Sequence, residues 1–334
     1  MRILVTGGAG YVGSACLRHL LERGHEATAY DNLCEGHAAA APDGRLIEGD
    51  IRNTEQFADA LRQVNAEAVM HFAAATYVGE SVTNPEYHYD NNIGGTLSLL
   101  NAMRRAGVKR LLFSSTCATY GDNPKPPMNE QAEQIPCSPY ARTKLAVEWM
   151  IRDFAHAYGM GFTLLRYFNA SGADVDGRYG EDHKPETHLI PIILQVPLGQ
   201  RDKVMIFGTD YPTPDGTCIR DYVHTADLAS AHLLAIEATD EDTAEVYNIG
   251  TGNGNSVLEV LKACENVVGQ EITHEVTDRR PGDAPALVAD PTKLKSRLGW
   301  QPQFPEIEQT VATAWAWHQS HPEGYTSPAS FSTP

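Results

Sequence analysis

The residues best suited to chemistry in this sequence are a tyrosine and a lysine four positions apart, Tyr140 and Lys144. Ser138-Pro139 precedes them, and a serine N-cap followed by proline at the first helical position is a typical helix start. Residues four apart on a helix share one face, so the ammonium group would lie beside the phenol. A nearby cation favours the phenolate and lowers the pKa of a phenol below its usual value of about 10. The pair therefore predicts a general base that works near neutral pH.

A hydroxyl group at the end of a predicted strand supports this interpretation. The run Phe113-Ser114-Ser115-Thr116 closes an apolar stretch, and ligands bind at the carboxyl ends of strands in doubly wound sheets. The Thr116 hydroxyl would hydrogen-bond a substrate oxygen alongside Tyr140. A Tyr-x-x-x-Lys pair by itself is also typical of a solvated helix face. This strand end is one of two features that favour the catalytic interpretation.

The second feature is a glycine-rich loop between a predicted strand, Ile3–Thr6, and a predicted helix. Gly7, Gly10 and Gly13 keep a regular three-residue spacing, with Tyr11-Val12 between the last two. Glycine allows the sharp turn, the close approach to a pyrophosphate and the packing of helix on strand. The helix N-terminus then offers N–H groups to phosphates. The loop predicts a dinucleotide-binding site.

An acidic residue further along the chain favours NAD as the dinucleotide. Asp31 lies 18 residues after Gly13, at the end of the second predicted strand, where a carboxylate can bind ribose hydroxyls. Its negative charge disfavours the 2′-phosphate of NADP. Asn32 follows it, and Asp50-Ile51, after a third short strand, would border the adenine. The alternative is that Asp31-Asn32 is a turn pair that caps the strand.

The elements that position these residues alternate in type along the first half of the chain. Short strands are expected over Ile3–Thr6, Glu26–Tyr30, Ala68–Phe72, Arg110–Ser114 and Thr163–Arg166. Helices are expected between and after them, over Val12–Glu22, Glu55–Arg62, Gly94–Ala106 and Tyr140–Ala157. This alternation predicts an α/β fold with a doubly wound parallel sheet of the Rossmann type.

The regular alternation ends after Asn169, where glycine, proline and aspartate become frequent. We therefore expect a dinucleotide-binding domain over residues 1–169 and a smaller C-terminal α/β substrate domain over residues 170–334. Parts of residues 218–250 are expected to pack back on the first domain.

The composition excludes several classes of partner. With 26 basic and 43 acidic residues, the 334-residue chain carries a formal net charge of −17, which repels nucleic acid and anionic membranes. No run approaches the roughly 18 apolar residues of a membrane span, and a strand pattern from Ile3 leaves no room for a signal segment, so a cytoplasmic protein is expected. Six cysteines without a C-x-x-C pair predict neither a disulfide framework nor a zinc site, and no metal site is predicted.

As a whole, the sequence resembles the extended short-chain dehydrogenases/reductases, and among them the UDP-glucose (UDP-galactose) 4-epimerases. The resemblance extends from the glycine loop to Trp315-Ala316-Trp317-His318 and includes the Tyr140–Lys144 pair. The other motifs that carry it are His71-Phe72-Ala73, Val78-Gly79-Glu80-Ser81-Val82, Asn91-Asn92, Arg166-Tyr167-Phe168-Asn169, Phe207-Gly208-x-Asp210-Tyr211-Pro212, Asp215-Gly216-Thr217, Arg220-Asp221-Tyr222-Val223-His224 and Arg279-Arg280-Pro281-Gly282-Asp283. It implies an NAD-dependent isomerase of galactose metabolism that inverts C4 of a UDP-sugar through a transient 4-ketone.

The resemblance also implies roles for individual residues. Tyr140 would be the base, Lys144 would hold the nicotinamide ribose, and Thr116 stands where the family uses serine or threonine. The residues that would line the cofactor are Phe72, Ala73, Ala74, Asn91, Ser114 and Tyr167. The residues that would hold the UDP-sugar are Phe168, Asn169, His188, Leu189, Phe207, Arg220, Arg280, Asp283 and Leu287.

Sugar preference is open at this point. Thr76 stands where many family members have lysine, Thr116 adds a methyl group relative to serine, and His188 replaces an asparagine common beside the uridine. Leu287 matches a position that faces the sugar ring, although it would equally pack in the core of the second domain. Its intermediate size favours UDP-glucose and UDP-galactose. UDP-xylose with UDP-arabinose, or UDP-N-acetylhexosamines, are the alternative substrates.

The same residues bear on other possible reactions and partners. A 4,6-dehydratase needs an acid directly after the strand-end hydroxyl, where Cys117-Ala118 stand. A net dehydrogenase or reductase stays open, because its first half-reaction is the same. A non-catalytic dinucleotide sensor, the alternative of another class, has no need for the tyrosine–lysine pair. The family implies a homodimer through helices Gly94–Ala106 and Tyr140–Ala157, although packing within one monomer would explain the same apolar faces.

Overall fold

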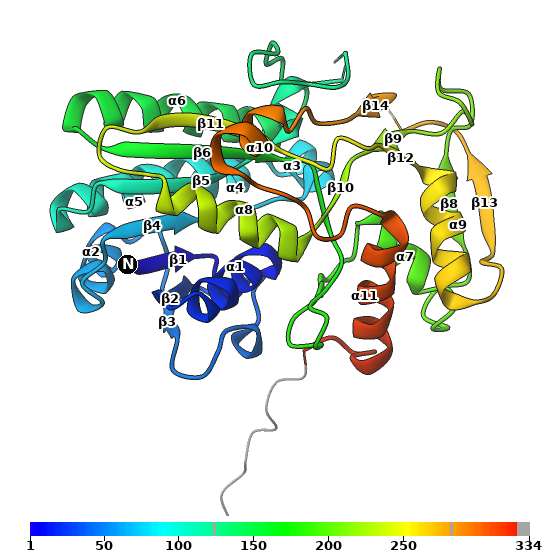
Figure 1. Cartoon of the computed structure of the whole chain (residues 1–334), viewed down its shortest axis with the longest axis horizontal. Helices are drawn as coiled ribbons and strands as arrows, with labels where there is room; N and C mark the ends of the chain where they lie inside the picture. Colours follow the sequence, from blue (N-terminus) through cyan, green and yellow to red (C-terminus); the bar gives the residue numbers. More distant parts are fainter. Residues whose placement is uncertain (123–124, 281–282, 326–334) are drawn as a thin grey trace, which may run out of the picture.

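A seven-stranded sheet forms the centre of the computed structural model, which describes residues 1–122, 125–280 and 283–325 (Figure 1). Every neighbouring pair of its strands runs parallel. In sheet order the strands are β11 (Ala244–Ile249), β6 (Gly161–Tyr167), β5 (Arg110–Thr116), β4 (Ala68–His71), β1 (Arg2–Thr6), β2 (Glu26–Asp31) and β3 (Leu46–Glu48). The predicted doubly wound parallel sheet is confirmed.

The sequence of the central strands explains why they are buried on both faces. All four residues of β4, Ala68-Val69-Met70-His71, are buried, and so are the first six of β6. A parallel sheet covered by helices on both sides is typically built from such near-continuous apolar runs. The five predicted strands all form, and β5 and β6 extend two or three residues beyond the expected ends.

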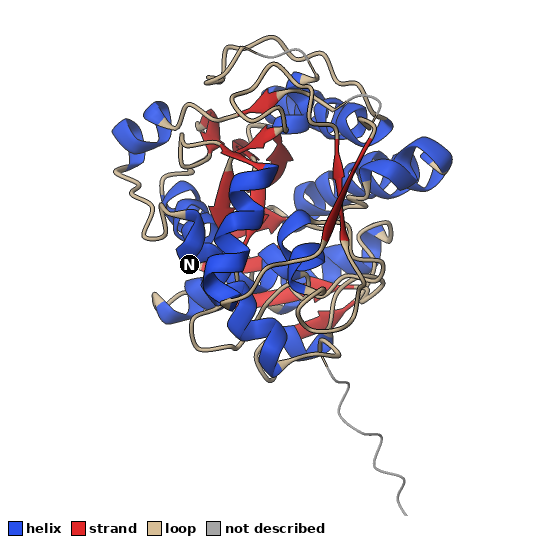
Figure 2. Ribbon diagram, turned by 90° about the vertical axis from the view of Figure 1, so that its right-hand side faces the viewer, coloured by secondary structure: helices blue, strands red, loops and turns tan. Residues whose placement is uncertain are grey.

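Helices cover both faces of this sheet. One face carries α1 (Tyr11–Glu22) and α8 (Thr225–Glu237), whose leucines and alanines pack on the strands in one buried cluster. The other face carries α2 (Thr54–Gln63), α5 (Gly95–Ala106) and α6 (Pro139–Tyr158) over a second cluster. Figures 1 and 2 show the sheet between these two layers.

Helix α6, which carries the tyrosine–lysine pair, begins and ends at well-defined caps. The Ser138 side chain accepts a hydrogen bond from the Ala141 N–H at 3.2 Å, and Pro139 occupies the first turn, as predicted. The helix ends at Gly159, whose φ of 62° is left-handed and favours glycine. These caps fix where α6 begins and ends.

Between β4 and α5 the chain makes several short helical segments that the sequence pattern did not predict. They are α3 (Val78–Thr83), α4 (Pro85–His88) and η2 (Tyr89–Gly94), the last of which is a π-helix that runs into α5. A π-turn inside a helix shifts the side chains that follow, and such turns are frequent at functional sites. This one buries the side chains of Asn91 and Asn92 beside the strand ends.

The C-terminal part builds smaller sheets and helices, most of which lie on the right of Figure 1. Its strands are β7 (Asn169–Ser171), β8 (Val204–Phe207), β9 (Ile219–Arg220), β10 (Tyr222–His224), β12 (Asn255–Ser256), β13 (His274–Thr277) and β14 (Ala286–Leu287). Its helices are α7 (Leu189–Leu194), α9 (Val257–Val268), α10 (Thr292–Leu298) and α11 (Ile307–Ser320), and the short 3₁₀ segments of the chain are η1 (Ala38–Ala40) and η3 (Cys117–Tyr120). Helices α7, α9 and α11 and strand β8 enclose a third apolar cluster.

The chain crosses between the two parts more than once, since α8 and β11 return to the large sheet. The domain boundary at residue 169 therefore stays a prediction. Of the motifs singled out in the sequence, Pro281-Gly282 lies outside the described residues. Among the helices of residues 1–122, 125–280 and 283–325, none is long and apolar enough to cross a membrane. All six cysteines are free.

One buried ion pair ties α6 to the two strands beneath it. Arg166 of β6 meets Glu148 of α6 at two points, with an Nη2–Oε2 distance of 2.6 Å and an Nε–Oε1 distance of 2.9 Å. Both side chains are at most 3% exposed. Ser115 of β5 donates to the same carboxylate at 2.5 Å, and Arg166 also donates to the Tyr120 hydroxyl at 3.1 Å. The network holds α6 in register with the strand ends that form the site.

We predict that replacing Arg166 with methionine lowers the free energy of unfolding by about 3–5 kcal/mol, because it leaves the Glu148 carboxylate buried and unpaired. The matched control is Arg62→Met, which removes an exposed pair with Asp59 at 2.7 Å and should cost no more than about 1 kcal/mol. Urea denaturation of both variants makes the comparison. Equal losses would contradict the role assigned to the buried pair.

Candidate active site

One large cleft, with a volume of about 1390 Å³, opens along the carboxyl ends of β1, β2, β4, β5 and β6. Its walls come from both parts of the chain, from the glycine loop at one end to β9 and β14 at the other. Nearly all the site residues predicted from the sequence line it. Of the predicted set, the three that do not line it are Asp50, Leu189 and Phe207.

The glycine loop has the close contacts that a phosphate-binding turn requires. Gly7 has a φ of +69°, and a Cβ there would lie 2.6 Å from the Ala73 nitrogen. A Cβ on Gly13 would lie 2.0 Å from the Gly7 oxygen, so a side chain at either position would force the loop apart. The first backbone bond of α1 runs from Ser14 N–H to the Gly10 oxygen, which leaves the preceding N–H groups without helical partners. These groups fit a pyrophosphate.

The carboxylate of Asp31 lies next to this loop and is 7% exposed. It accepts hydrogen bonds from the N–H of Ala9 at 3.0 Å and of Leu33 at 2.9 Å, one on each oxygen. Burial raises the pKa of Asp31, and the two backbone donors offset part of that effect. A carboxylate has lone pairs to spare beyond these two bonds, so it can also accept from a ribose diol. These residues fit NAD.

Asp50 and Ile51 are placed differently although they are neighbours. The Ile51 side chain is buried and lines the cleft. The Asp50 carboxylate faces Arg52 instead, with an Nη2–Oδ2 distance of 2.7 Å, and the hydrogen bonds from Arg52 lower its pKa to about 2. Asn32, which lines the cleft, donates to Asp50 at 3.3 Å. Asp50 therefore supports the wall of the cleft from behind.

A network of short contacts fixes the far end of the predicted cofactor region. The Ser114 and Tyr167 hydroxyls lie 2.5 Å apart, and the Lys144 side chain donates to the backbone carbonyl oxygen of Ser114 at 2.9 Å. Asn91 lines the cleft and donates to Asn92 at 3.1 Å. The predicted residues that form this wall are Phe72, Ala73, Ala74, Asn91, Ser114, Lys144 and Tyr167.

The expected lowering of the Tyr140 pKa is wrong for the protein alone. Burial raises the pKa of the Tyr140 hydroxyl to about 12, and the neighbouring Thr116 hydroxyl offsets only part of that rise. Burial also lowers the pKa of Lys144 to about 7, with Glu148 opposing the change. Desolvation disfavours the charged form of both groups, so the lysine contributes less positive charge than its spacing suggested. A phenolate at neutral pH therefore needs a further positive charge in the cleft.

Thr116 ends β5 and turns its hydroxyl toward the helix that follows. Its side chain accepts from the Ala118 N–H at 3.1 Å and caps η3. Thr116 and Tyr140 both line the cleft, together with Cys117 and Ala118. The strand-end hydroxyl and the tyrosine thus meet in one place, as their positions in the sequence predicted.

The opposite wall presents two arginines. Arg220 donates to the oxygens of Ile219 at 2.9 Å and Ala284 at 2.8 Å, and its Nη2 lies 3.6 Å from Asp283. Arg280 lies over the ring of Phe207, with 3.8 Å between its Cζ and the ring centroid. Phe207 thus acts through Arg280 and not as a direct wall of the cleft. Both guanidinium groups line the cleft and suit an anionic ligand.

The remaining predicted substrate residues surround these arginines, except for Leu189. Phe168, Asn169, His188 and Leu287 line the cleft, whereas Leu189 packs at the start of α7 against the third apolar cluster. The Leu287 side chain also packs on the small cluster that contains Phe168. Leu287 therefore fits both interpretations that the sequence left open, because it lines the cleft and also packs against other apolar side chains.

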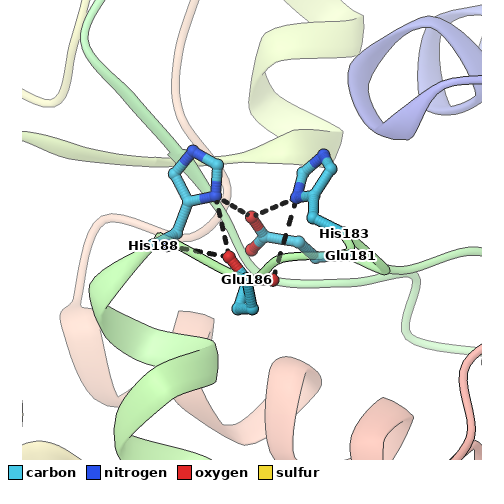
Figure 3. Close-up of side chains that lie close together, drawn as sticks. All are labelled: Glu181, His183, Glu186 and His188. Atoms are coloured by element: carbon cyan, nitrogen blue, oxygen red, sulfur yellow. Dashed lines mark hydrogen bonds and ion pairs between the residues drawn. The ribbon is translucent and has the colours of Figure 1, made fainter. Parts of the chain in front are cut away.

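Apart from His188, residues 180–188 were not predicted from the sequence to form part of the cleft. His183 and Glu186 line the cleft, with Glu181 buried behind them and His188 beside them (Figure 3). Burial acts to lower the pKa of His183, but the charges of Glu181 and Glu186 outweigh it and raise the pKa to about 9. The alternation of acids and histidines over eight residues was the available signal.

The same segment closes over the loop that follows Asp31. The His37 imidazole lies 3.3 Å from the Asp182 carboxylate, and its ring stacks on Tyr325 with centroids 4.9 Å apart. The Tyr325 N–H donates to Asp182 at 2.8 Å. The strap formed by residues 180–188 thus connects the predicted cofactor region to the C-terminal segment, a contact between residues too distant in sequence to predict.

With this geometry in place, comparison with known proteins is informative. The chain matches the NAD dependent epimerase/dehydratase family over residues 3–250. It is 49% identical over 328 residues to a UDP-glucose 4-epimerase of Halalkalibacterium halodurans, with 98% of each chain covered.

Solved structures agree. The fold is similar to a crystal structure of a UDP-glucose 4-epimerase with a TM-score of 0.94 and 44% identity, covering 98% of this chain and all of the other. It is also similar to the Brucella ovis UDP-glucose 4-epimerase in complex with NAD, with a TM-score of 0.91, 44% identity and coverage of 94% and 97%.

Proposed function

Because the chain belongs to the NAD dependent epimerase/dehydratase family, we infer that it is an isomerase that interconverts UDP-glucose and UDP-galactose with the help of NAD. This conclusion rests on the residues that line one cleft. A glycine loop with a carboxylate suited to a ribose lies at one end, and two arginines lie at the other. Tyr140, the buried Lys144 and the strand-end hydroxyl of Thr116 lie between them. These groups match the three parts of the reaction, namely cofactor, nucleotide and sugar.

The tyrosine accepts the proton in this reaction. Tyr140 removes the hydrogen of the sugar 4-hydroxyl, while the Thr116 hydroxyl holds the same oxygen by a hydrogen bond. NAD, when bound, accepts a hydride from C4 and returns it. Since the pKa of Tyr140 is about 12 in the protein alone, the positive charges of Lys144 and of the oxidised nicotinamide are needed to favour the phenolate. Proton removal is thus coupled to a loaded cofactor site.

Inversion at C4 requires that the sugar turns while the nucleotide stays in place. Arg220 and Arg280 are held by backbone oxygens and by the Phe207 ring, so they offer fixed charge to the diphosphate. The 4-keto sugar can then rotate about its link to UDP and present its other face. Hydride return, which bound NAD would supply, then takes place on the other face of C4, and Tyr140 returns the proton to the oxygen, so the 4-hydroxyl is inverted.

The chemistry of the cleft disfavours two alternatives. A 4,6-dehydratase needs an acid beside the strand-end hydroxyl, and the residues that line the cleft there are Cys117 and Ala118. Burial raises the pKa of Cys117 to about 12, so its thiol does not act as that acid or base near neutral pH. A non-catalytic dinucleotide sensor would not need a lysine buried beside Tyr140, at the cost of desolvating its charge.

The test of the proposed mechanism is Tyr140→Phe, which removes the proton acceptor and leaves the ring. We expect turnover of UDP-galactose to fall by at least ~100-fold while NAD remains bound, since general-base catalysis contributes on that scale. Tyr158→Phe, at the exposed end of the same helix, is the control and should keep full activity. NMR of the two C4 epimers measures turnover, and near-normal turnover of Tyr140→Phe would refute the assignment.

The finer sugar preference rests on Leu287, whose side chain lines the cleft beside Phe168. We propose that its size admits hexoses and the smaller pentoses, and that it restricts N-acetylhexosamines. UDP-xylose and UDP-arabinose lack C6 and should fit, so a pentose epimerase remains the alternative of the same class.

We predict that Leu287→Tyr lowers turnover of UDP-N-acetylglucosamine about 10-fold or more relative to UDP-glucose, because a larger wall excludes the acetyl group. Leu287→Ala should shift the ratio in the opposite direction. The kcat/KM values of both sugars in each variant decide the matter. If both substrates lose activity together in both variants, Leu287 has only a packing role.

A homodimer through α5 and α6 is also part of this proposal. Leu97 of α5 and Trp149 and Tyr158 of α6 are large apolar side chains that are 42%, 58% and 46% exposed. Large exposed apolar side chains on adjacent helices are typical of a protein interface. The six free cysteines fit a reducing compartment, so the cytoplasm is the location we propose.

A further inference from the structure

Four side chains of the strap converge on one point at the edge of the cleft, as Figure 3 shows. They are Glu181, His183, Glu186 and His188, and one ligand atom from each lies within 4.8 Å of all the others. The glutamate side chains are 5% and 6% exposed, and His183 is 18% exposed. Two carboxylates and two imidazoles in such proximity need an explanation, because buried carboxylates are costly unless they are paired.

The nitrogen–oxygen separations in the cluster, measured to either oxygen of Glu186, bracket those in the ligand shell of a tetrahedral cation. His183 Nδ1 lies 3.2 Å from Glu181 Oε1 and 3.8 Å from Glu186 Oε2. His188 Nδ1 lies 2.6 Å from Glu181 Oε1 and 3.1 Å from Glu186 Oε1. Ligands about 2.0–2.2 Å from a tetrahedral zinc ion lie about 3.4 Å from one another. The observed separations fall on both sides of that value.

Hydrogen bonds satisfy only part of the cluster. His188 Nδ1 and Glu186 Oε1 are hydrogen-bonded at 3.1 Å. Glu181 Oε1 and His183 Nδ1 are both buried, and neither makes a well-directed hydrogen bond with any described residue, although they are within ion-pair distance of one another. A cation between these two atoms would give both of them a partner.

The charge of the cluster is compatible with an ion. In the protein alone the two carboxylates raise the pKa of both imidazoles, so the histidines are protonated and the cluster is neutral overall. A divalent cation would displace the two imidazole protons and use the freed lone pairs, which leaves the net charge of the cluster unchanged. The nitrogen ligands select a transition metal, since Mg²⁺ and Ca²⁺ prefer oxygen ligands only. His183, Glu186 and His188 line the cleft, so an ion can enter from it.

We propose that Glu181, His183, Glu186 and His188 form a binding site for a divalent transition metal of the Zn²⁺ type. The sequence led us to expect no metal site because that expectation rested on cysteine spacing, and this cluster contains no cysteine. The residues assigned to proton transfer belong to other elements, and of the four proposed ligands only His188 is also assigned to the UDP-sugar. The site would place a fixed cation in the wall of a cleft that binds anions.

The experiment measures metal binding and not activity. The full chain with its bound NAD is stripped with a chelator and titrated with ZnCl₂ by calorimetry at neutral pH, and bound zinc is counted by elemental analysis after dialysis. We expect one Zn²⁺ per chain and no binding of Mg²⁺. In His183→Gln and Glu186→Gln the affinity should fall at least ~10-fold, the scale on which even outer-shell substitutions act.

Two controls make the result specific. His156→Gln removes an exposed histidine near the end of α6 and should bind zinc as the unaltered chain does. Cys34 and Cys137 are exposed thiols that also bind zinc, so Co²⁺ is used in its place to record a spectrum. The proposed site holds nitrogen and oxygen ligands, and its spectrum should lack the strong near-ultraviolet band of thiolate-bound cobalt.

The proposal is overturned if the unaltered chain binds no zinc, if both variants bind it as tightly as the unaltered chain, or if the cobalt spectrum shows thiolate ligands. Bound NAD content verifies that each variant is folded. Should His183→Gln fail to fold, Glu181→Gln, which keeps the shape of that side chain and removes its charge, provides the same comparison. Loss of zinc binding with epimerisation intact, or the reverse, separates this proposal from the proposed function.

Discussion

Parallel pairing of the central strands is the constraint on which the site depends. Because β1, β4, β5 and β6 all run in one direction, their carboxyl ends open onto the same edge of the sheet. The glycine loop follows β1, the strand-end hydroxyl of Thr116 closes β5, and α6 packs against β5 and β6. The Arg166–Glu148 pair fixes that packing from inside the core. Groups far apart in the chain thereby meet in one cleft.

Desolvation governs the chemistry in this cleft. The same burial that raises the pKa of Tyr140 to about 12 lowers that of Lys144 to about 7, so neither group favours its charged form in the protein alone. An oxidised nicotinamide, when bound, would add the missing positive charge. Tyr140 would then stay protonated until the cofactor site is loaded.

Local patterns were sufficient to predict the sheet, the glycine loop and the tyrosine with its strand-end hydroxyl, whereas the substrate side of the cleft was predicted from the family resemblance. The apolar runs, the Ser138-Pro139 helix start and the spacing of Gly7, Gly10 and Gly13 act over a few residues, and the structure places those residues as expected. The pKa of Tyr140 was mispredicted because helical spacing shows which groups are neighbours but not how deeply they are buried. The π-turn at η2 was not predicted because a wider helical turn requires no particular residue type that could be recognised in the sequence.

Contacts between residues far apart in the sequence could not be predicted from local patterns. Phe207 supports Arg280 from beneath, and Leu189 turns into the third apolar cluster, although both belong to motifs of the substrate side. The strap formed by residues 180–188 meets His37 and Tyr325 only because the chain folds back on the cofactor loop. Its histidines and glutamates look like ordinary surface residues in the sequence, and only the fold brings their ligand atoms together.

The most direct test of the account is the fate of the hydrogen at C4. UDP-galactose is converted by the protein in D₂O, and NMR of the UDP-glucose formed measures deuterium at that carbon. If C4 loses and regains a hydride inside the closed cleft, while Tyr140 exchanges only the hydroxyl proton, the product keeps its original hydrogen at C4. Deuterium at C4 would show that this hydrogen passes through solvent as a proton, and would contradict the mechanism.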